Sequence, residues 1–308
     1  MKRVLFSMFA TLLATTISAQ QIAVVDGSGQ TSVYYSLDEA IESATDGCTI
    51  YLPSGGFQVK GETRINKRVT IMGIGHRPES DNADVNTIIS GDVNFAPGSD
   101  GSAIMGVYMS NNLNIGTDGS VKNILVKYCN INEISVKTDS CSDIEVNQNY
   151  IRGNAWFAKT NARVTNNIMH GIGDINGGII MNNLIIDCSY NYYERYYGYH
   201  YYSYYEVDNS TIINNIQRYG FYGCDNCIAR DNWEGDITTI INKWNGISTT
   251  SDFHFNDTYE GDTNIGIYGG TGFSDDCLPP MPRITSKNIA EQTDEQGKLK
   301  IQVTVKNK

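Results

Sequence analysis

The chain has 308 residues, of which 40% are hydrophobic and 19% are charged, so it is long enough to bury a substantial core as one main domain. Its formal net charge of -11 disfavours a nucleic-acid partner. The seven cysteines are an odd number, which leaves at least one outside any set of intrachain disulfides.

The first segment has the organisation of a secretory signal peptide. Lys2 and Arg3 precede an uncharged run from Val4 to Ile17, and Ser18-Ala19 supplies small residues before the cleavage site. Residues 1–19 therefore predict export of a soluble protein, to the periplasm, the cell surface or the medium. This run is too short to span a bilayer and no later apolar run is long enough, so we predict no transmembrane segment.

A short helix is predicted to begin at Ser36. Ser36 and Glu39 have the spacing of a capping box, the apolar residues from Leu37 to Ala44 share one face, and Gly47 follows as a stop. Strands are predicted at 49–52 and 68–75, separated by turn residues. A helix in this place would cover the apolar end of the first strands, which is otherwise an open edge.

Further strands are predicted at 87–90, 103–109 and 112–115, between turns rich in Asp and Gly. The turns at 80–84 and 98–101 lack the spacing of a known calcium loop, so we interpret them as solvated turns. Cys224-Asp-Asn-Cys227 also favours a turn over a redox pair or half a zinc site, because no second CxxC or His pair lies nearby. We predict no metal site.

One short pattern recurs between Val121 and Trp233: an apolar residue stands three positions before an Asn. The segments are Val126-Lys-Tyr-Cys129, Val146-Asn-Gln-Asn149, Val164-Thr-Asn-Asn167, Ile180-Met-Asn-Asn183, Ile212-Ile-Asn-Asn215 and Ala229-Arg-Asp-Asn232. Their last residues are 20, 18, 16, 32 and 17 positions apart. This period is too short for helix pairs and suits strand-turn-strand units that bury their apolar faces by stacking.

Asparagine is expected at the corner of each unit. It tolerates a left-handed backbone, and its amide both donates and accepts, so stacked copies can bond to one another. The predicted ladder consists of Asn149, Asn167, Asn183, Asn215 and Asn232.

The repeat resembles the asparagine-laddered right-handed parallel β-helix of the pectate-lyase-like superfamily. The strict recurrence argues against the alternative, an Asn-rich β-sandwich. The entry segment and the closing Gly-Ile-Tyr-Gly-Gly and Leu-Pro-Pro-Met-Pro segments are similar to those of exported Bacteroidetes β-helix proteins, most of which lack an assigned activity. The resemblance implies an all-β, single-stranded solenoid over residues 20–282, with an N-terminal helical cap.

The C-terminal part is expected to close this solenoid. Residues 233–255 are interpreted as a last group of coils, with Trp233 and Trp244 filling the core, and the prolines at 279, 280 and 282 forbid further ladder bonding. In the tail at 283–308, apolar and polar residues alternate from Leu299 to Val305, which predicts a capping strand. The alternative role for this tail is a junction with another surface component.

The longest gap in the ladder holds a tyrosine-rich insertion at 188–206. Residues 190–205 contain ten of the twenty tyrosines and keep neither a strand nor a helix period, which indicates a loop or short hairpin. Tyrosine offers a flat face and a hydroxyl to a sugar ring, so we expect binding of a polysaccharide or cell-surface glycan. Packing on the flank of the solenoid, or an oligomer contact, is the alternative. The candidate ligand-binding residues are Tyr192, Tyr193, Tyr196, Tyr197, Tyr199, Tyr201 and Tyr202.

The reaction, if any, is not specified by these residues, because this kind of scaffold supports lyases, hydrolases, adhesins and inert spacers. We expect non-catalytic binding without a cofactor. The first alternative is a polysaccharide lyase acting on a uronate glycan, with calcium as a possible ion and Arg195, His200, loop tyrosines, Arg218 or His170 as candidates. The clustered Asp residues of a hydrolase are missing. A structural or adhesive surface protein is the second alternative, and nothing in the sequence specifies an oligomeric state.

Overall fold

The structure is a computed structural model that describes residues 21–76, 86–186, 206–218, 224–275, 278–279, 283–289, 298 and 301–306. The predicted signal peptide at 1–19 and the Asp-rich turn at 80–84 lie outside the described residues. All seven candidate tyrosines also lie outside them, as do Arg195 and His200, and of the insertion at 188–206 only Glu206 is described.

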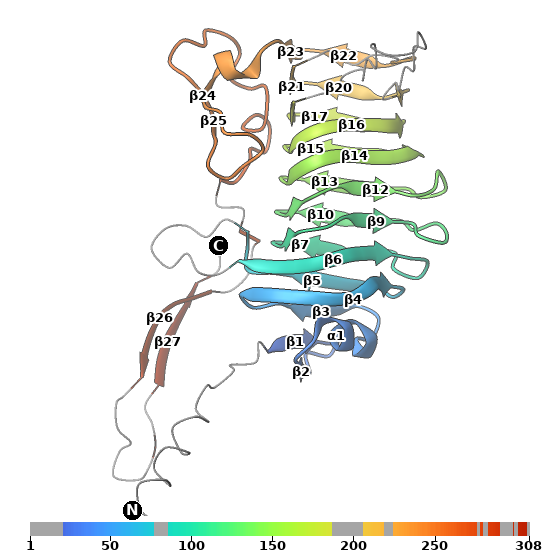
Figure 1. Cartoon of the computed structure of the whole chain (residues 1–308), viewed down its shortest axis with the longest axis vertical. Coiled ribbons are helices and arrows are strands. Elements are labelled where there is room, and N and C mark those ends of the chain that lie inside the picture. Colours follow the sequence, from blue (N-terminus) through green and yellow to red (C-terminus); the bar gives the residue numbers. More distant parts are fainter. Residues whose placement is uncertain are drawn as a thin grey trace, which may run out of the picture.

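The chain is all-β, with two large sheets whose strands are almost all parallel (Figure 1). The first sheet contains, in spatial order, β2 (Thr31–Tyr34), β1 (Ile22–Val25), β3 (Cys48–Tyr51), β5 (Val69–Met72), β7 (Ala103–Met105), β10 (Leu125–Lys127), β13 (Ile144–Asn147), β15 (Ala162–Thr165), β17 (Ile179–Met181), β20 (Thr211–Ile213) and β22 (Ile228–Arg230). Only β1 pairs antiparallel within it, with β2 and β3.

The second sheet is parallel throughout its described strands. It contains β4 (Gly55–Ile65), β6 (Thr87–Phe95), β8 (Tyr108–Met109), β9 (Leu113–Ile115), β11 (Asn130–Ile131), β12 (Ile134–Val136), β14 (Tyr150–Thr160), β16 (Ile168–Asn176), β18 (Leu184–Ile185), β19 (Val207–Asp208), β21 (Ile216–Gln217) and β23 (Trp233–Glu234). The chain thus alternates between the sheets, and we call each segment with one strand in the first sheet and one or two in the second a unit.

The units stack in register because one apolar residue of each strand from β3 to β20 in the first sheet points into the interior. These residues pair with one another from strand to strand, and all are 0% exposed: Ile50, Ile71, Ile104, Val126, Val146, Val164, Ile180 and Ile212. A slip of one residue would turn this column outward, so burial specifies the register.

The helix predicted near Ser36 is confirmed as α1 (Leu37–Ser43). The Ser36 hydroxyl accepts a hydrogen bond from the Glu39 backbone N–H at 3.1 Å, as an N-cap residue does. Leu37, Ala40 and Ile41 are buried, and Figure 1 shows α1 beside the first strands at one end of the stack.

The parallel strands end with β23, which differs from the expectation of further coils through residue 255. Asp236 accepts a hydrogen bond from the Thr238 backbone N–H and caps a short 3-10 helix, η1 (Ile237–Thr239), so the chain turns out of the sheet. β24 (Ile241–Lys243) and β25 (Asp252–Phe255) then form an antiparallel pair.

The segment after β23 packs on the outside of the stack. It covers a row of outward-facing residues that each follow a ladder position: Tyr150, Ile168, Leu184 and Ile216. The covering side chains are Ile237, Ile240, Ile241, Phe253, Ile265, Ile267 and Phe273. Trp233 and Trp244 are half-buried against this second cluster and do not lie in the interior between the sheets.

The tail forms a hairpin of β26 (Arg283–Ile289) and β27 (Ile301–Lys306), which pair with each other. Among the described strands neither pairs with the two large sheets, and Figure 1 shows the hairpin beside the stack rather than across its end. No helix in the described part of the chain is long and apolar enough to cross a bilayer.

Candidate functional site

The structure places the five ladder asparagines in one column at the corner between the two sheets. The side-chain NH2 group of each asparagine donates to the side-chain oxygen of the next asparagine in the column. The distances are 2.9 Å from Asn149 to Asn167, 3.1 Å from Asn167 to Asn183, 3.0 Å from Asn183 to Asn215 and 3.0 Å from Asn215 to Asn232. At the start of the column, the Cys129 backbone N–H donates to the Asn149 side-chain oxygen at 2.9 Å.

The left-handed backbone at this corner belongs to the residue before the ladder asparagine, which corrects the expectation from the sequence. The positive φ values are 55° at Gln148, 56° at Asn166, 56° at Asn182 and 58° at Asn214. The ladder residue itself uses its side chain to satisfy the backbone of the corner: Asn167 donates to the carbonyl oxygens of Val146 and Thr165.

The residues with positive φ hold the C-terminal segment. Asn166 donates to the carbonyl oxygens of Ile267 and Gly269, each at 2.8 Å, and Asn182 donates to that of Asn264 at 2.8 Å. Because Asn166 and Asn182 use their side chains to bind the C-terminal segment, we interpret this corner as structural.

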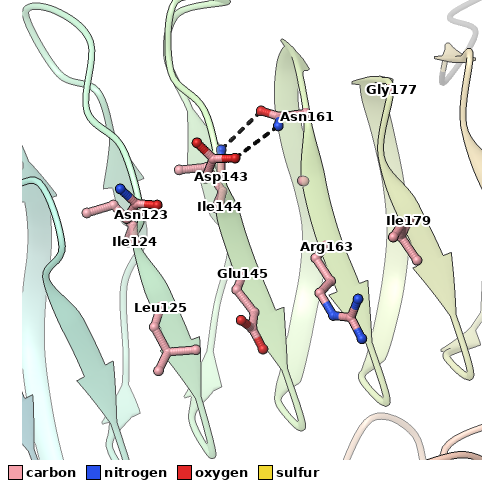
Figure 2. A pocket seen from close by; sticks show the side chains of 11 residues that line it. Asn123, Ile124, Leu125, Asp143, Ile144, Glu145, Asn161, Arg163, Gly177 and Ile179 are labelled. Atoms are coloured by element: carbon pink, nitrogen blue, oxygen red, sulfur yellow. Dashed lines mark hydrogen bonds between the residues drawn. The ribbon is translucent and has the colours of Figure 1, made fainter.

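A groove lies on the outer face of the first sheet, over four consecutive units (Figure 2). Its volume is about 380 Å³, and its floor is formed by side chains from β10, β13, β15 and β17. The floor residues pair directly across the strands: Leu125 with Glu145, Glu145 with Arg163, and Arg163 with Ile179.

The floor residues are positioned by the ladder. Each stands four positions before a ladder residue, one before the buried apolar residue, and successive strand residues face opposite sides of the sheet. The inward-facing column therefore forces Leu125, Glu145, Arg163 and Ile179 outward in one row. The row spans about 14 Å, three strand spacings.

A polar rim borders the floor where the strands begin. The Asn161 side chain donates to one Asp143 carboxylate oxygen at 3.2 Å, its oxygen accepts from the Asp143 backbone N–H at 3.0 Å, and Ser142 donates to the other carboxylate oxygen at 2.9 Å. Figure 2 shows this pair at the edge of the groove, away from the ends of the Glu145 and Arg163 side chains. These bonds fix the rim, while both side chains remain exposed.

The two charged floor residues are available to a ligand. Within the described residues neither Glu145 nor Arg163 takes part in an ion pair or a side-chain hydrogen bond. The carboxylate supplies acceptors only and the guanidinium donors only. With Leu125 and Ile179 on either side, the groove presents an apolar strip around one acceptor and one donor.

A second hollow, of about 570 Å³, lies beside α1. Its polar groups are bonded to one another: Asp38 accepts from the Lys60 backbone N–H and the Thr63 hydroxyl, and Lys67 donates to the carbonyl oxygens of Glu42 and Ala44. These bonds join the helix to the sheet, so we interpret this hollow as a structural joint.

Two of the candidates for a lyase lie in one row across the second sheet, His170 within β16 and Arg218 directly after β21. His170 and Arg218 directly follow Met169 and Gln217, and these strands are joined in register through Ile185. The two side chains thus stand two strand spacings apart, about 10 Å. The His170 ring contacts the Asn154 side-chain oxygen at 3.2 Å. His170 and Arg218 are both exposed.

The sequence analysis did not single out Glu145 or Arg163, although a signal for them was present. Once the apolar residue before each ladder asparagine is taken as inward-facing, the residue preceding it must face outward. What the sequence lacks is the sideways alignment of consecutive units, which brings residues 18 positions apart into contact.

Neither the family models, the curated proteins nor the solved structures contain a significant match to this chain. The described residues contain no group of three or more His, Cys, Asp or Glu side chains that could hold a metal ion. The groove therefore has to be interpreted from its own chemistry.

Proposed function

We propose that the stacked units form a single-stranded right-handed parallel β-helix of the pectate-lyase-like kind, with α1 covering its N-terminal end. The parallel register and the return of the chain to the same sheet after 16 to 32 residues support this architecture. On the basis of residues 1–19, the protein is exported and works outside the cytoplasm.

We further propose that this protein binds a polysaccharide or a cell-surface glycan without cleaving it. The observation that carries the proposal is the outward row of Leu125, Glu145, Arg163 and Ile179. Ligand sites combine apolar lining with a few polar groups that fix orientation. Sugars match this pattern, because their hydroxyls both donate and accept while their C–H faces are apolar. The length of the row accommodates a short run of sugar residues.

The tyrosine-rich insertion remains part of this proposal on the strength of its sequence. We propose that Tyr197 and Tyr202 offer exposed rings to the same class of ligand. Replacing both by Ala is expected to weaken glycan binding severalfold with little change in melting temperature, because exposed rings contribute little to folding. Tyr35→Ala is the matched control, since Tyr35 is 61% exposed between β2 and α1. A large loss of stability with binding unchanged would make the tyrosines packing residues.

The experiment for the groove is a panel of neutral, acidic and amino-sugar polysaccharides, assayed for retardation in affinity gels and for ultraviolet absorbance of unsaturated products. We expect retardation by at least one polysaccharide and no absorbance. Glu145→Gln and Arg163→Gln should each reduce retardation severalfold, because each removes a charge from the floor while keeping a polar side chain.

Glu42→Gln and Lys243→Gln are the matched controls. Both residues are exposed and lie outside the groove, on α1 and β24, so they change the net charge by the same amounts. If the groove variants and the controls changed retardation equally, net charge alone would explain the binding, and the proposal would be contradicted. Absence of binding to every polysaccharide would favour the structural or adhesive alternative.

A polysaccharide lyase is the second candidate, and the alignment of His170 and Arg218 in one row across the second sheet favours it. A lyase needs a base for the proton next to a uronate carboxylate and a cation to neutralise that carboxylate. Absorbance on polyuronates, abolished by His170→Ala and Arg218→Ala and stimulated by added calcium, would establish this activity. The groove variants Glu145→Gln and Arg163→Gln should then leave the rate unchanged.

A further inference from the structure

Cys224 and Cys227 enclose the tight turn that leads into β22, the last strand of the first sheet. Asp225 and Asn226 form the turn, and Asn226 has a φ of 55°, so the chain reverses within four residues. A side-chain hydrogen bond joins the two thiols. Both thiols are half-buried and pack against the main core cluster.

The turn is held on the preceding unit by backbone and side-chain bonds. The Cys227 thiol donates to the Val207 carbonyl oxygen at 3.0 Å, and the Asn209 backbone N–H donates to the Asp225 carbonyl oxygen at 2.8 Å. The Asn226 side chain donates to that of Asn209 at 3.3 Å. The two sulfurs are therefore kept on the same side of a fixed turn.

We propose that Cys224 and Cys227 form an intrachain disulfide that fastens the turn before β22. The geometry supplies the reason: both thiols flank a two-residue turn, both pack against the same core cluster, and the turn is specified by its own bonds. Strand β22 is where such a bond matters, because it has one neighbour in the sheet and all three of its residues are exposed. An exported chain would meet the oxidising conditions in which disulfides persist.

The bond forms by thiol–disulfide exchange with an external disulfide, such as oxidised glutathione or a protein disulfide. Burial, followed by the neighbouring Cys227, Asp208 and Asp225, raises the pKa of Cys224 to about 12. Cys224 therefore stays protonated. Cys227 gives its proton to the solvent and attacks the external disulfide, releasing one thiolate. Cys224 then passes its proton to a released thiolate and attacks the Cys227 sulfur, which expels the second. The second released thiolate takes up the proton that Cys227 gave to the solvent. In total the protein loses two protons and two electrons, and the external disulfide gains them and becomes two thiols.

The test uses the folded full-length chain with wild-type cysteines. The reduced protein is incubated with oxidised glutathione, quenched in acid, denatured, alkylated with iodoacetamide and digested with trypsin. Cleavage after Arg218 and Arg230 releases residues 219–230, which contain Cys224 and Cys227 and no other cysteine. We expect this peptide to be unalkylated and lighter by two hydrogens than the dithiol form. The peptide 128–137, which carries the buried Cys129, should be alkylated in the same digest and serves as the control.

The proposal is overturned if both cysteines of 219–230 carry the alkyl group, or if either is linked to another peptide. Retention of one zinc per reduced chain, with the pair protected from alkylation at full mass, would also overturn it in favour of a metal site. A second measurement uses the double variant Cys224→Ser with Cys227→Ser. Adding reductant should lower the melting temperature of the oxidised wild-type protein by several degrees and leave that of the variant unchanged. Equal melting temperatures of wild-type protein with and without reductant would contradict a fastening role.

Discussion

Two neighbouring residues at each corner of the stack have different physical roles, although both are often asparagine. Asn166 adopts the left-handed backbone that turns the chain, and Asn167 satisfies the backbone groups that the turn leaves unpaired. Only the second residue is repeated strictly. Gln148 and Asn182 show that a left-handed corner accepts more than one residue type when its side chain finds a partner.

The ladder leads to a prediction for Asn167, which is fully buried. Asn167→Leu removes the bonds to Asn149 and Asn183 and leaves their buried amide groups short of a partner. The expected loss in the free energy of unfolding is about 1 to 3 kcal/mol. Chemical denaturation of the variant, against Asn111→Leu at an exposed turn, measures it. An unchanged midpoint for Asn167→Leu would remove the ladder as a source of stability.

The thiol of Cys129 gives a second prediction at this scale. Burial raises the pKa of Cys129 to about 12, against the weaker, lowering effect of hydrogen bonds with the backbone of Val107, Gly106 and Lys127. Because the thiolate is the reactive form, Cys129 should resist iodoacetamide at pH 8 in the folded protein and react on unfolding. Peptide mass analysis of residues 128–137 before and after denaturation checks this. Rapid alkylation in the folded protein would show that the interior is open near the first unit of the ladder.

Asp252 leads to a prediction of pH dependence. Its hydrogen bond with His254, and then that with Asn242, lower the pKa of the Asp252 carboxyl below its ordinary value. A lowered pKa in the folded state contributes stability that is complete above about pH 4 and is lost as the pH falls through the folded pKa. The melting temperature of Asp252→Asn should therefore lie below that of wild type at neutral pH. This difference in melting temperature should disappear below pH 4. A difference that grows on acidification would contradict the lowered pKa of Asp252.

At the scale of elements, the outer layer after β23 is the main addition that the structure makes to the sequence analysis. Tyr150, Ile168, Leu184 and Ile216 occupy positions that face away from the interior, so alternation alone marks them as exposed. They are buried because the chain folds back over them. The pattern along one strand does not show that its outward residues will be covered. The rings that cover Tyr150, those of Phe253 and Phe273, follow it by more than a hundred positions.

The outer layer should contribute measurably to stability. Phe273 is 7% exposed, and its ring meets that of Tyr150 edge to face with 5.4 Å between centroids. Phe273→Ala is expected to cost about 3 kcal/mol, the lower end of the range for buried Phe. In this variant, backbone hydrogen exchange should become faster at 264–275 in particular. The control Val33→Ala, at an exposed edge strand, should change neither the free energy of unfolding nor the exchange rate at 264–275. A loss of stability without faster exchange at 264–275 would contradict the packing of this layer on the stack.

The elements that the sequence predicted are those with local signals. The helix near Ser36 follows from its cap and its apolar spacing, and strands such as 87–90 follow from bounded apolar runs. Residues 233–255 were expected to continue the stack because they contain short apolar runs of the same kind. The turn at Asp236 and the pairing of β24 with β25 depend on the surroundings and could not be predicted from those runs.

For the whole molecule, the candidate site exists only as a product of stacking. Leu125, Glu145, Arg163 and Ile179 come from four different units, and no unit alone contains more than one of them. The interior column and the asparagine ladder hold the units in one register, so the same contacts that stabilise the fold also align the groove. We therefore expect that a change that disrupts the register of the units also abolishes ligand binding in the groove.

The most direct measurement is hydrogen exchange of the full chain with and without a glycan selected from the panel. We predict slower exchange on binding in the peptides that cover 123–127, 143–147, 161–165 and 177–181, with any protection at 190–205 added to this pattern. In the double variant that carries both Glu145→Gln and Arg163→Gln, the protection of these four segments should disappear at the same glycan concentration. Protection confined to 190–205, or to any surface outside the four segments, would contradict the groove as the binding site.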